Sequence, residues 1–106
     1  MEINEDKEKT KPLTFEDATH AIAKELAELV ISKQRDYGHE NILAFGELGI
    51  LVRSNDKMAR LKNLQGRDAV NEPRIDAWSD LGGYSILALM LDREWFQLEL
   101  SNDNNI

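Results

Sequence analysis

Two segments, RSNDKMAR (residues 53–60) and EPRIDAWSD (residues 72–80), carry charges of opposite sign at helical spacing. In the first segment Arg53, Lys57 and Arg60 recur at i, i+4 and i+7, so a helix would align them along one side as a basic stripe. Arginine offers a planar fork to phosphate oxygens and lysine a point charge, so the basic stripe suits a phosphorylated ligand. The alternative is a salt-bridged helix surface.

The second segment carries an acidic stripe, in which Glu72, Asp76 and Asp80 recur every fourth residue. Stacked carboxylates repel one another unless they face water, face cations or share a metal ion. Mg²⁺ prefers such hard oxygen ligands. We therefore predict a Mg²⁺ site formed by these three residues and Glu47 from the preceding helix. The alternative is a solvated acidic face, or ion pairs with the basic stripe.

The composition indicates a helix-rich globular chain of 106 residues, with 42% hydrophobic and 31% charged residues and few prolines and glycines. We predict an all-α fold, an antiparallel helical bundle of three to four helices. A chain of this length buries only a modest core, so we expect a homo-oligomer to complete the bundle. We expect a flexible arm, one helical domain and a flexible tail, over residues 1–12, 13–98 and 99–106 respectively.

Capping signals and apolar periodicity define the expected helices. Thr14 is a suitable N-cap for a helix that ends near Lys33, and Asn71 is a suitable cap before the proline of a later helix. The resulting helices span residues 14–33, 42–64 and about 72–96, with a polar connection over 34–41.

Apolar side chains at helical spacing are the expected core of the first two helices. The third helix is apolar around much of its circumference from Leu81 onward, and we expect the surplus to form a subunit interface. The core candidates of the first two helices are Phe15, Ala18, Ile22, Leu26, Leu29, Val30, Leu48, Leu51, Val52, Met58 and Leu61.

Glycines inside two expected helices need an explanation, because each costs about 1 kcal/mol relative to alanine. Gly46 and Gly49 indicate a close helix crossing, a break into two helices near Gly49, or close approach of the backbone to a ligand. A crossing with the glycine pair at residues 82–83 would bring Glu47 near the acidic stripe.

The polar connection contains Asp36 and Tyr37, which could supply a polar contact and a stacking ring for a base. A turn aspartate and a half-buried tyrosine are the alternative. His20 and His39 have no partner at metal-ligand spacing, and we expect both on the surface.

Charge and hydropathy argue against several classes of protein. The net charge of −7 argues against general binding to duplex DNA, which requires many cationic contacts. No apolar run approaches the roughly 20 residues of a membrane span, and the N-terminus lacks the apolar core of a signal peptide. The absence of cysteine is compatible with a cytoplasmic protein.

Several of these motifs together resemble the family called nucleotide-modification-associated domain one, small phage and bacterial proteins associated with nucleotide metabolism. The resemblance covers residues 31–90. More distantly, the chain is similar to the all-α nucleoside triphosphate pyrophosphatases of the MazG and dimeric dUTPase type. The motifs are KxxDYG (33–38), GELGILVR (46–53), DKxxRLxNL (56–64), NExxxDxWxDL (71–81) and GYxILAL (83–89).

The second resemblance implies an enzyme that holds Mg²⁺ with acidic residues on two neighbouring helices and hydrolyses a nucleoside triphosphate to the monophosphate and pyrophosphate. By position, Glu47, Asp76 and Asp80 would be its catalytic and metal-binding acids. The phage association implies the cytoplasm of a bacterial host. The expected substrate contacts are Lys33, Asp36, Tyr37, Arg53, Asp56, Lys57 and Arg60.

Two other functions remain open from the sequence. A non-catalytic protein that binds and sequesters a nucleotide, of an anti-defence type, would use the same basic stripe. A partner protein of a DNA-modification complex would instead dock through the apolar third helix.

Overall fold

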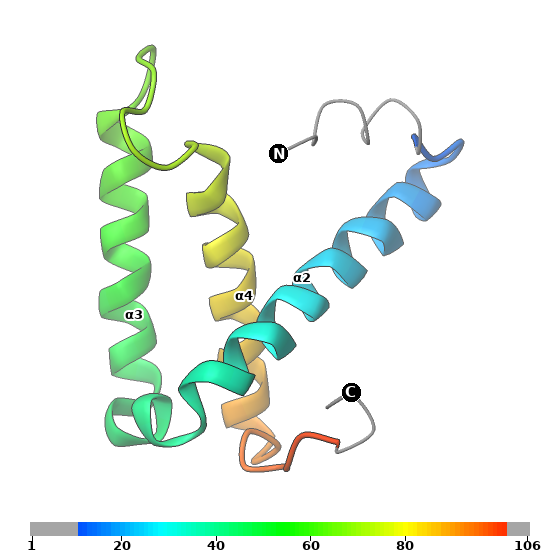
Figure 1. Cartoon of the computed structure of the whole chain (residues 1–106), viewed down its shortest axis with the longest axis vertical. Helices are drawn as coiled ribbons and strands as arrows, with labels where there is room; N and C mark the ends of the chain where they lie inside the picture. Colours follow the sequence, from blue (N-terminus) through cyan, green and yellow to red (C-terminus); the bar gives the residue numbers. More distant parts are fainter. Residues whose placement is uncertain (1–10, 102–106) are drawn as a thin grey trace.

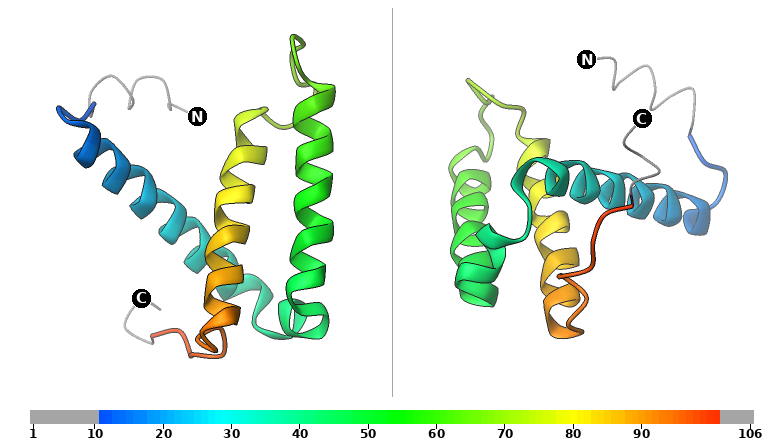
Figure 2. Two further views of the ribbon diagram at one scale, coloured as in Figure 1. Left: turned by 180° about the vertical axis from the view of Figure 1, so that it is seen from behind. Right: turned by 60° about the horizontal axis from the view of Figure 1, so that its bottom comes forward.

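The computed structural model describes residues 11–101, which fold into three α-helices without a strand (Figure 1). The helices are α2 (Phe15–Tyr37), α3 (Glu40–Asn63) and α4 (Ile75–Asp92). α3 and α4 lie side by side and run antiparallel, and α2 crosses α4 obliquely (Figures 1 and 2). The predicted all-α bundle is confirmed.

α2 begins as predicted and ends later than predicted. The Thr14 hydroxyl accepts a hydrogen bond from the Asp17 amide at 3.0 Å, which caps the first turn. The helix continues to Tyr37 and ends at Gly38, whose φ of 70° is in the left-handed region. The expected connection over 34–41 is therefore mostly helical, because no residue before the glycine forces the helix to stop.

α3 is interrupted near its start by Gly46, with φ of 60° and ψ of −146°. A side chain is strongly disfavoured in this conformation, so the glycine permits the break. Gly49 has a different role, because a Cβ atom there would lie 2.7 Å from the Cβ of Phe45. The predicted break is present, three residues before the expected position.

α4 is shorter than predicted at both ends. Arg74 occupies the N-cap position without a side-chain cap, so the prediction that Asn71 caps the helix is wrong. At the other end Glu94 adopts a φ of 61°, and the Trp95 amide donates to the Met90 carbonyl at 2.8 Å. This reversal ends the helix and folds the following segment back toward the core.

The glycine pair of α4 marks the crossing with α2. A Cβ atom on Gly82 would lie 2.7 Å from Leu26 Cδ1, and one on Gly83 would lie 3.3 Å from Val30 Cγ2. The prediction that this pair crosses the glycine-bearing segment of α3 is therefore wrong. The glycine pair in the sequence indicates that another helix packs closely against α4, but it does not identify which helix.

The main core cluster consists of Ile42 and Ile50 from α3 and Phe96 from the segment after α4. His39 packs its ring edge against Phe96, with 5.5 Å between ring centroids, and its Nε2 lies 3.1 Å from the Leu98 carbonyl oxygen. These contacts hold the α2–α3 turn against the C-terminal segment. His39 is half-buried rather than on the surface as predicted, whereas the predicted exposure of His20 is confirmed.

Much of the apolar surface of α4 that we expected at a subunit interface is packed within the chain instead. Leu89 is an exception, at 61% exposed. The half-buried side chains around the core cluster are Tyr84, Leu87, Ala88, Met90 and Leu91.

Several predicted core residues are exposed in the single chain. α2 has no buried residue, and Phe15 and Ile22 are exposed. Of the α3 candidates, Leu61 is buried as predicted. The other four are exposed, so their assignment to the core of one chain is wrong; they are Leu48, Leu51, Val52 and Met58.

None of the helices within residues 11–101 is long and apolar enough to cross a membrane. Most of the predicted arm and tail, residues 1–10 and 102–106, lie outside the described residues.

Candidate functional site

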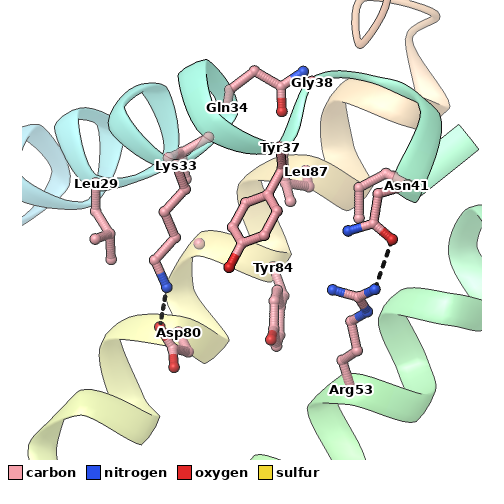
Figure 3. Close-up of a pocket in the computed structure, with 13 residues that line it drawn as sticks. Leu29, Lys33, Gln34, Tyr37, Gly38, Asn41, Arg53, Asp80, Tyr84 and Leu87 are labelled. Atoms are coloured by element: carbon pink, nitrogen blue, oxygen red, sulfur yellow. Dashed lines mark hydrogen bonds and ion pairs between the residues drawn. The ribbon is translucent and has the colours of Figure 1, made fainter.

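A cavity of about 250 Å³ lies where the C-terminal half of α2 meets α3 and α4 (Figure 3). Leu29 and Leu87 contribute apolar wall. Tyr37 at the end of α2 and Tyr84 from α4 place two aromatic rings in the same cavity. The helix break and the short α2–α3 turn position these groups, because they fold the start of α3 back beside α4.

Arg53 is the cation of α3 that lines this cavity. Its side chain is half-buried, and its Nη2 donates to the Asn41 amide oxygen at 2.8 Å (Figure 3). No carboxylate forms an ion pair with Arg53 within the described part of the chain. Among the described residues the guanidinium thus has a neutral hydrogen-bond acceptor and no counter-ion, which leaves its charge available to an anion.

Asp80 lies at one side of the cavity between two lysines. Lys33 Nζ lies 3.0 Å from Oδ1, and Lys57 Nζ lies 2.9 Å from Oδ2. The side chains of Lys33, Lys57 and Asp80 are 52%, 27% and 14% exposed. One ammonium group thus faces each carboxylate oxygen, and this network joins all three helices.

The network changes the acid–base properties of its members. Burial by itself raises the pKa of Asp80, but the hydrogen bonds from Lys57 and Lys33 outweigh it and hold the pKa below the usual value. The hydrogen bond to Asp80 raises the pKa of Lys57, against a smaller opposing effect of burial. Asp80 is therefore ionised at neutral pH, with its charge already compensated.

The acidic stripe does not fit a Mg²⁺ site in this arrangement. Within residues 11–101, no three His, Asp or Glu side chains form a group that could hold a metal ion. Glu47 and Glu72 are exposed, Asp76 is half-buried, and both oxygens of Asp80 face lysines. For Asp80, the geometry matches the ion-pair alternative that the sequence left open. Mg²⁺ stays a prediction.

The basic stripe serves three different parts of the fold. Arg53 faces the cavity, Lys57 pairs with Asp80, and Arg60 donates to the backbone carbonyls of Glu72 and Pro73. Arg60 thereby satisfies the polar backbone of the loop between α3 and α4. Although helical spacing aligns the three cations along α3, the fold places only Arg53 at the cavity.

The expected substrate contacts are only partly brought together. Lys33, Tyr37 and Arg53 line the cavity. Asp36 and Asp56 are exposed and, like Lys57 and Arg60, are not among the lining residues.

Sequence reasoning missed Asn41 and Tyr84. Tyr84 follows Asp80 by one helical turn, and this spacing is a signal that could have placed it on the same face of α4. Asn41 becomes a neighbour of Arg53 because the break at Gly46 folds the start of α3 back. No local sequence pattern predicts this contact.

Comparisons with protein families, with curated proteins and with solved structures found no match to this chain. The family resemblance therefore stays a prediction, and the site is interpreted from its own geometry.

Proposed function

We propose that this chain binds a nucleotide in the cavity, with a phosphate group on Arg53 and the base beside Tyr37 and Tyr84. The observation that carries the proposal is the half-buried Arg53 guanidinium, whose one hydrogen-bond acceptor within residues 11–101 is the Asn41 amide. Two aromatic rings in the same cavity offer surfaces on which a base can stack.

The energetics favour an anion at Arg53. The guanidinium is already charged, so its hydrogen bond to the Asn41 amide is charge-assisted. A phosphate group adds the attraction of the opposite charge and can accept two parallel N–H donors from one arginine. Lys33 is half-exposed and can turn toward a phosphate, because Asp80 would keep Lys57 as its partner. The ligand would therefore gain two cations without leaving a carboxylate unpaired.

The dimensions favour one nucleotide over a longer chain. A cavity of about 250 Å³ lies just below the range of about 300–1,000 Å³ that drug-sized ligands occupy. The apolar walls suit the base and the cations suit the phosphate, so both ends of a mononucleotide have a complementary surface.

Ligand retention without turnover is the form of this function that the geometry supports best. Mg²⁺-dependent hydrolysis of a nucleoside triphosphate would require carboxylates gathered around the ion. No three acidic side chains within residues 11–101 are gathered in this way, and Asp80, the acidic residue that lines the cavity, is held by two lysines. The alternative of a docking protein for a DNA-modification complex predicts no affinity for small molecules.

Calorimetric titration with nucleosides and their mono-, di- and triphosphates, in EDTA and then in Mg²⁺, tests the proposal. We expect phosphorylated ligands to bind and unphosphorylated nucleosides to bind more weakly. Arg53→Gln should weaken binding at least about tenfold, because one charge-assisted hydrogen bond is lost. Arg67→Gln is the matched control, since Arg67 is an exposed arginine bonded to the carbonyl of Asn63, away from the cavity.

A second pair of variants tests the stacking contact. Tyr37 is 67% exposed, so its replacement should cost little stability. Tyr37→Ala should weaken binding by about 1–2 kcal/mol, whereas Tyr37→Phe retains the ring and should bind as the parent does. Binding that is unchanged in Arg53→Gln and Tyr37→Ala would refute the site. Monophosphate and pyrophosphate detected by mass spectrometry in Mg²⁺ would instead establish the hydrolase.

A further inference from the structure

α3 presents an apolar surface to solvent on the side opposite α4. We define the outer face of α3 as Leu48, Leu51, Val52, Asn55 and Met58. Its four apolar side chains are 69%, 57%, 57% and 41% exposed, in that order. α3 lies at the edge of the molecule in every view, with α4 along one side only (Figures 1 and 2).

α3 differs from an ordinary surface helix in that three of its cations face the rest of the chain. The side toward α4 carries Arg53, Lys57 and Arg60, which bond within the chain, alongside the buried Ile50 and Leu61. The outer face consists of apolar residues and Asn55, and the exposed Glu47 and Asp56 border it, one helical turn from Leu51 and Val52. A helix that is apolar on its solvent side is expected to have a partner.

The spacing of the outer face matches one and a half heptads of a helix–helix seam, which ends before Lys62. Leu48, Leu51, Asn55 and Met58 are separated by three, four and three residues, the alternation of a and d positions in a heptad. Leu48 and Asn55 then occupy a positions, and Leu51 and Met58 occupy d positions. Val52 lies beside this seam.

The exposed side chains of this face offer a substantial apolar contact. Their exposed fractions together amount to about two fully exposed large apolar side chains. Pairing two copies would bury the equivalent of about four such side chains, each of which contributes about 1.5–3 kcal/mol when fully buried. The absence of any buried residue in α2 indicates further that one chain alone covers little of its apolar surface.

Asn55 indicates which partner binds the outer face of α3. A polar side chain in an apolar seam is costly to bury unless it has a hydrogen-bond partner. A carboxamide is self-complementary, because its oxygen can accept from the NH₂ group of a second carboxamide. A two-fold axis beside Asn55 would supply that second carboxamide, and one polar a position also defines the register of such a pair.

We propose that a second copy of this chain docks on the outer face of α3, around a two-fold axis beside Asn55. The two copies pair their apolar side chains from Leu48 to Met58, and the two Asn55 amides bond to each other. The seam itself carries no charged residue, and the carboxylates of Glu47 and Asp56 lie exposed beside it. The proposal does not depend on the nucleotide site, which lies on the other side of α3.

Sedimentation equilibrium of the full chain is the first test, and we expect a dimer. Leu51→Glu would place a charge in the seam and should raise the dimer dissociation constant at least tenfold. Leu89→Glu is the matched control, because Leu89 is 61% exposed on α4 and receives the same change of chemistry. Helical content measured by circular dichroism verifies that each variant folds. A monomeric parent, or dissociation of Leu89→Glu but not of Leu51→Glu, would overturn the proposal.

Single-cysteine variants supply a second test that does not rely on disrupting the pair. The chain contains no cysteine, so Asn55→Cys introduces a unique thiol. A disulfide forms only when two Cα atoms come within about 7 Å, which a two-fold axis beside residue 55 provides. Mild oxidation of a dilute sample should give a covalent dimer of Asn55→Cys and leave Leu89→Cys monomeric on a non-reducing gel. Equal cross-linking of both variants would show that the disulfides form by random encounters between chains and not at the proposed interface.

Discussion

Replacing Asp80 with asparagine tests whether the lysine–aspartate–lysine network stabilises the fold. Asp80→Asn preserves the shape of the side chain but removes the charge that Lys33 and Lys57 share. The Lys33 pair is half-exposed and contributes about 0.2–0.5 kcal/mol, as surface pairs do. The less exposed Lys57 pair contributes about 1 kcal/mol, between the surface and buried ranges.

The expected loss is therefore about 1–2 kcal/mol in the free energy of unfolding at pH 7. For a domain of about this size, each 1 kcal/mol lowers Tm by roughly 4–8 °C. Thermal and urea unfolding followed by circular dichroism would measure the loss. Protein concentration is held constant, because association would make Tm depend on it.

The pH dependence of this loss follows from the lowered pKa of Asp80. A carboxyl whose pKa is lower in the folded chain than its ordinary value of 3.8 contributes stability that is fully present above that value. The contribution disappears as the pH falls through the lowered pKa of the folded state. The difference between the parent and Asp80→Asn should therefore be full at pH 7 and shrink steadily below about pH 4.

The exposed Asp56 provides the control for this experiment, because Asp56→Asn makes the same chemical change on the surface of α3. It should alter stability by less than about 0.5 kcal/mol. The reasoning fails if Asp80→Asn is as stable as the parent at pH 7, or if its deficit persists undiminished at pH 3. A deficit of equal size in Asp56→Asn would point to net charge rather than to the network.

Two glycine substitutions test the backbone features that position the site. Gly46→Ala should lower the free energy of unfolding by about 1–3 kcal/mol, because a φ of 60° is strained for alanine although no atom lies within 4 Å of the new Cβ. The urea midpoint should fall accordingly, and an unchanged midpoint would argue against the break in α3. Gly82→Val should destabilise by about 1–3 kcal/mol through contact with Leu26, and Leu26→Ala should recover part of that loss in the double variant. Strictly additive losses would mean that these two residues do not meet.

The all-α class and the approximate positions of the helices could be predicted from the sequence, because they depend on local interactions. Thr14 caps its own first turn, and apolar periodicity along each segment favours helix. The boundaries were less accurate. α2 continues through a polar segment to Gly38, since only the glycine supplies a positive φ there.

The sequence could predict which residues are suited to the candidate site, but not which partners they contact. Lys33, Tyr37 and Arg53 were expected to contact one ligand, and the structure places all three at the same cavity. Their role as substrate contacts stays a prediction. The partners of Asp80 were not determined by spacing. Lys33 reaches it from α2, far away in sequence, and the pairing exists because α2 crosses α4 at the glycine pair.

The sequence by itself therefore determined which residues share a helix face, since 3.6 residues per turn is a property of the backbone. Only the tertiary structure decided which face turns inward. On α3, the side with Arg53 and Lys57 faces α4, where Asp80 and backbone carbonyls satisfy its charges, and the apolar side with Leu48 and Leu51 faces out. That choice depends on the helix crossing and on the break at Gly46, which involve contacts between distant parts of the chain that local spacing does not encode.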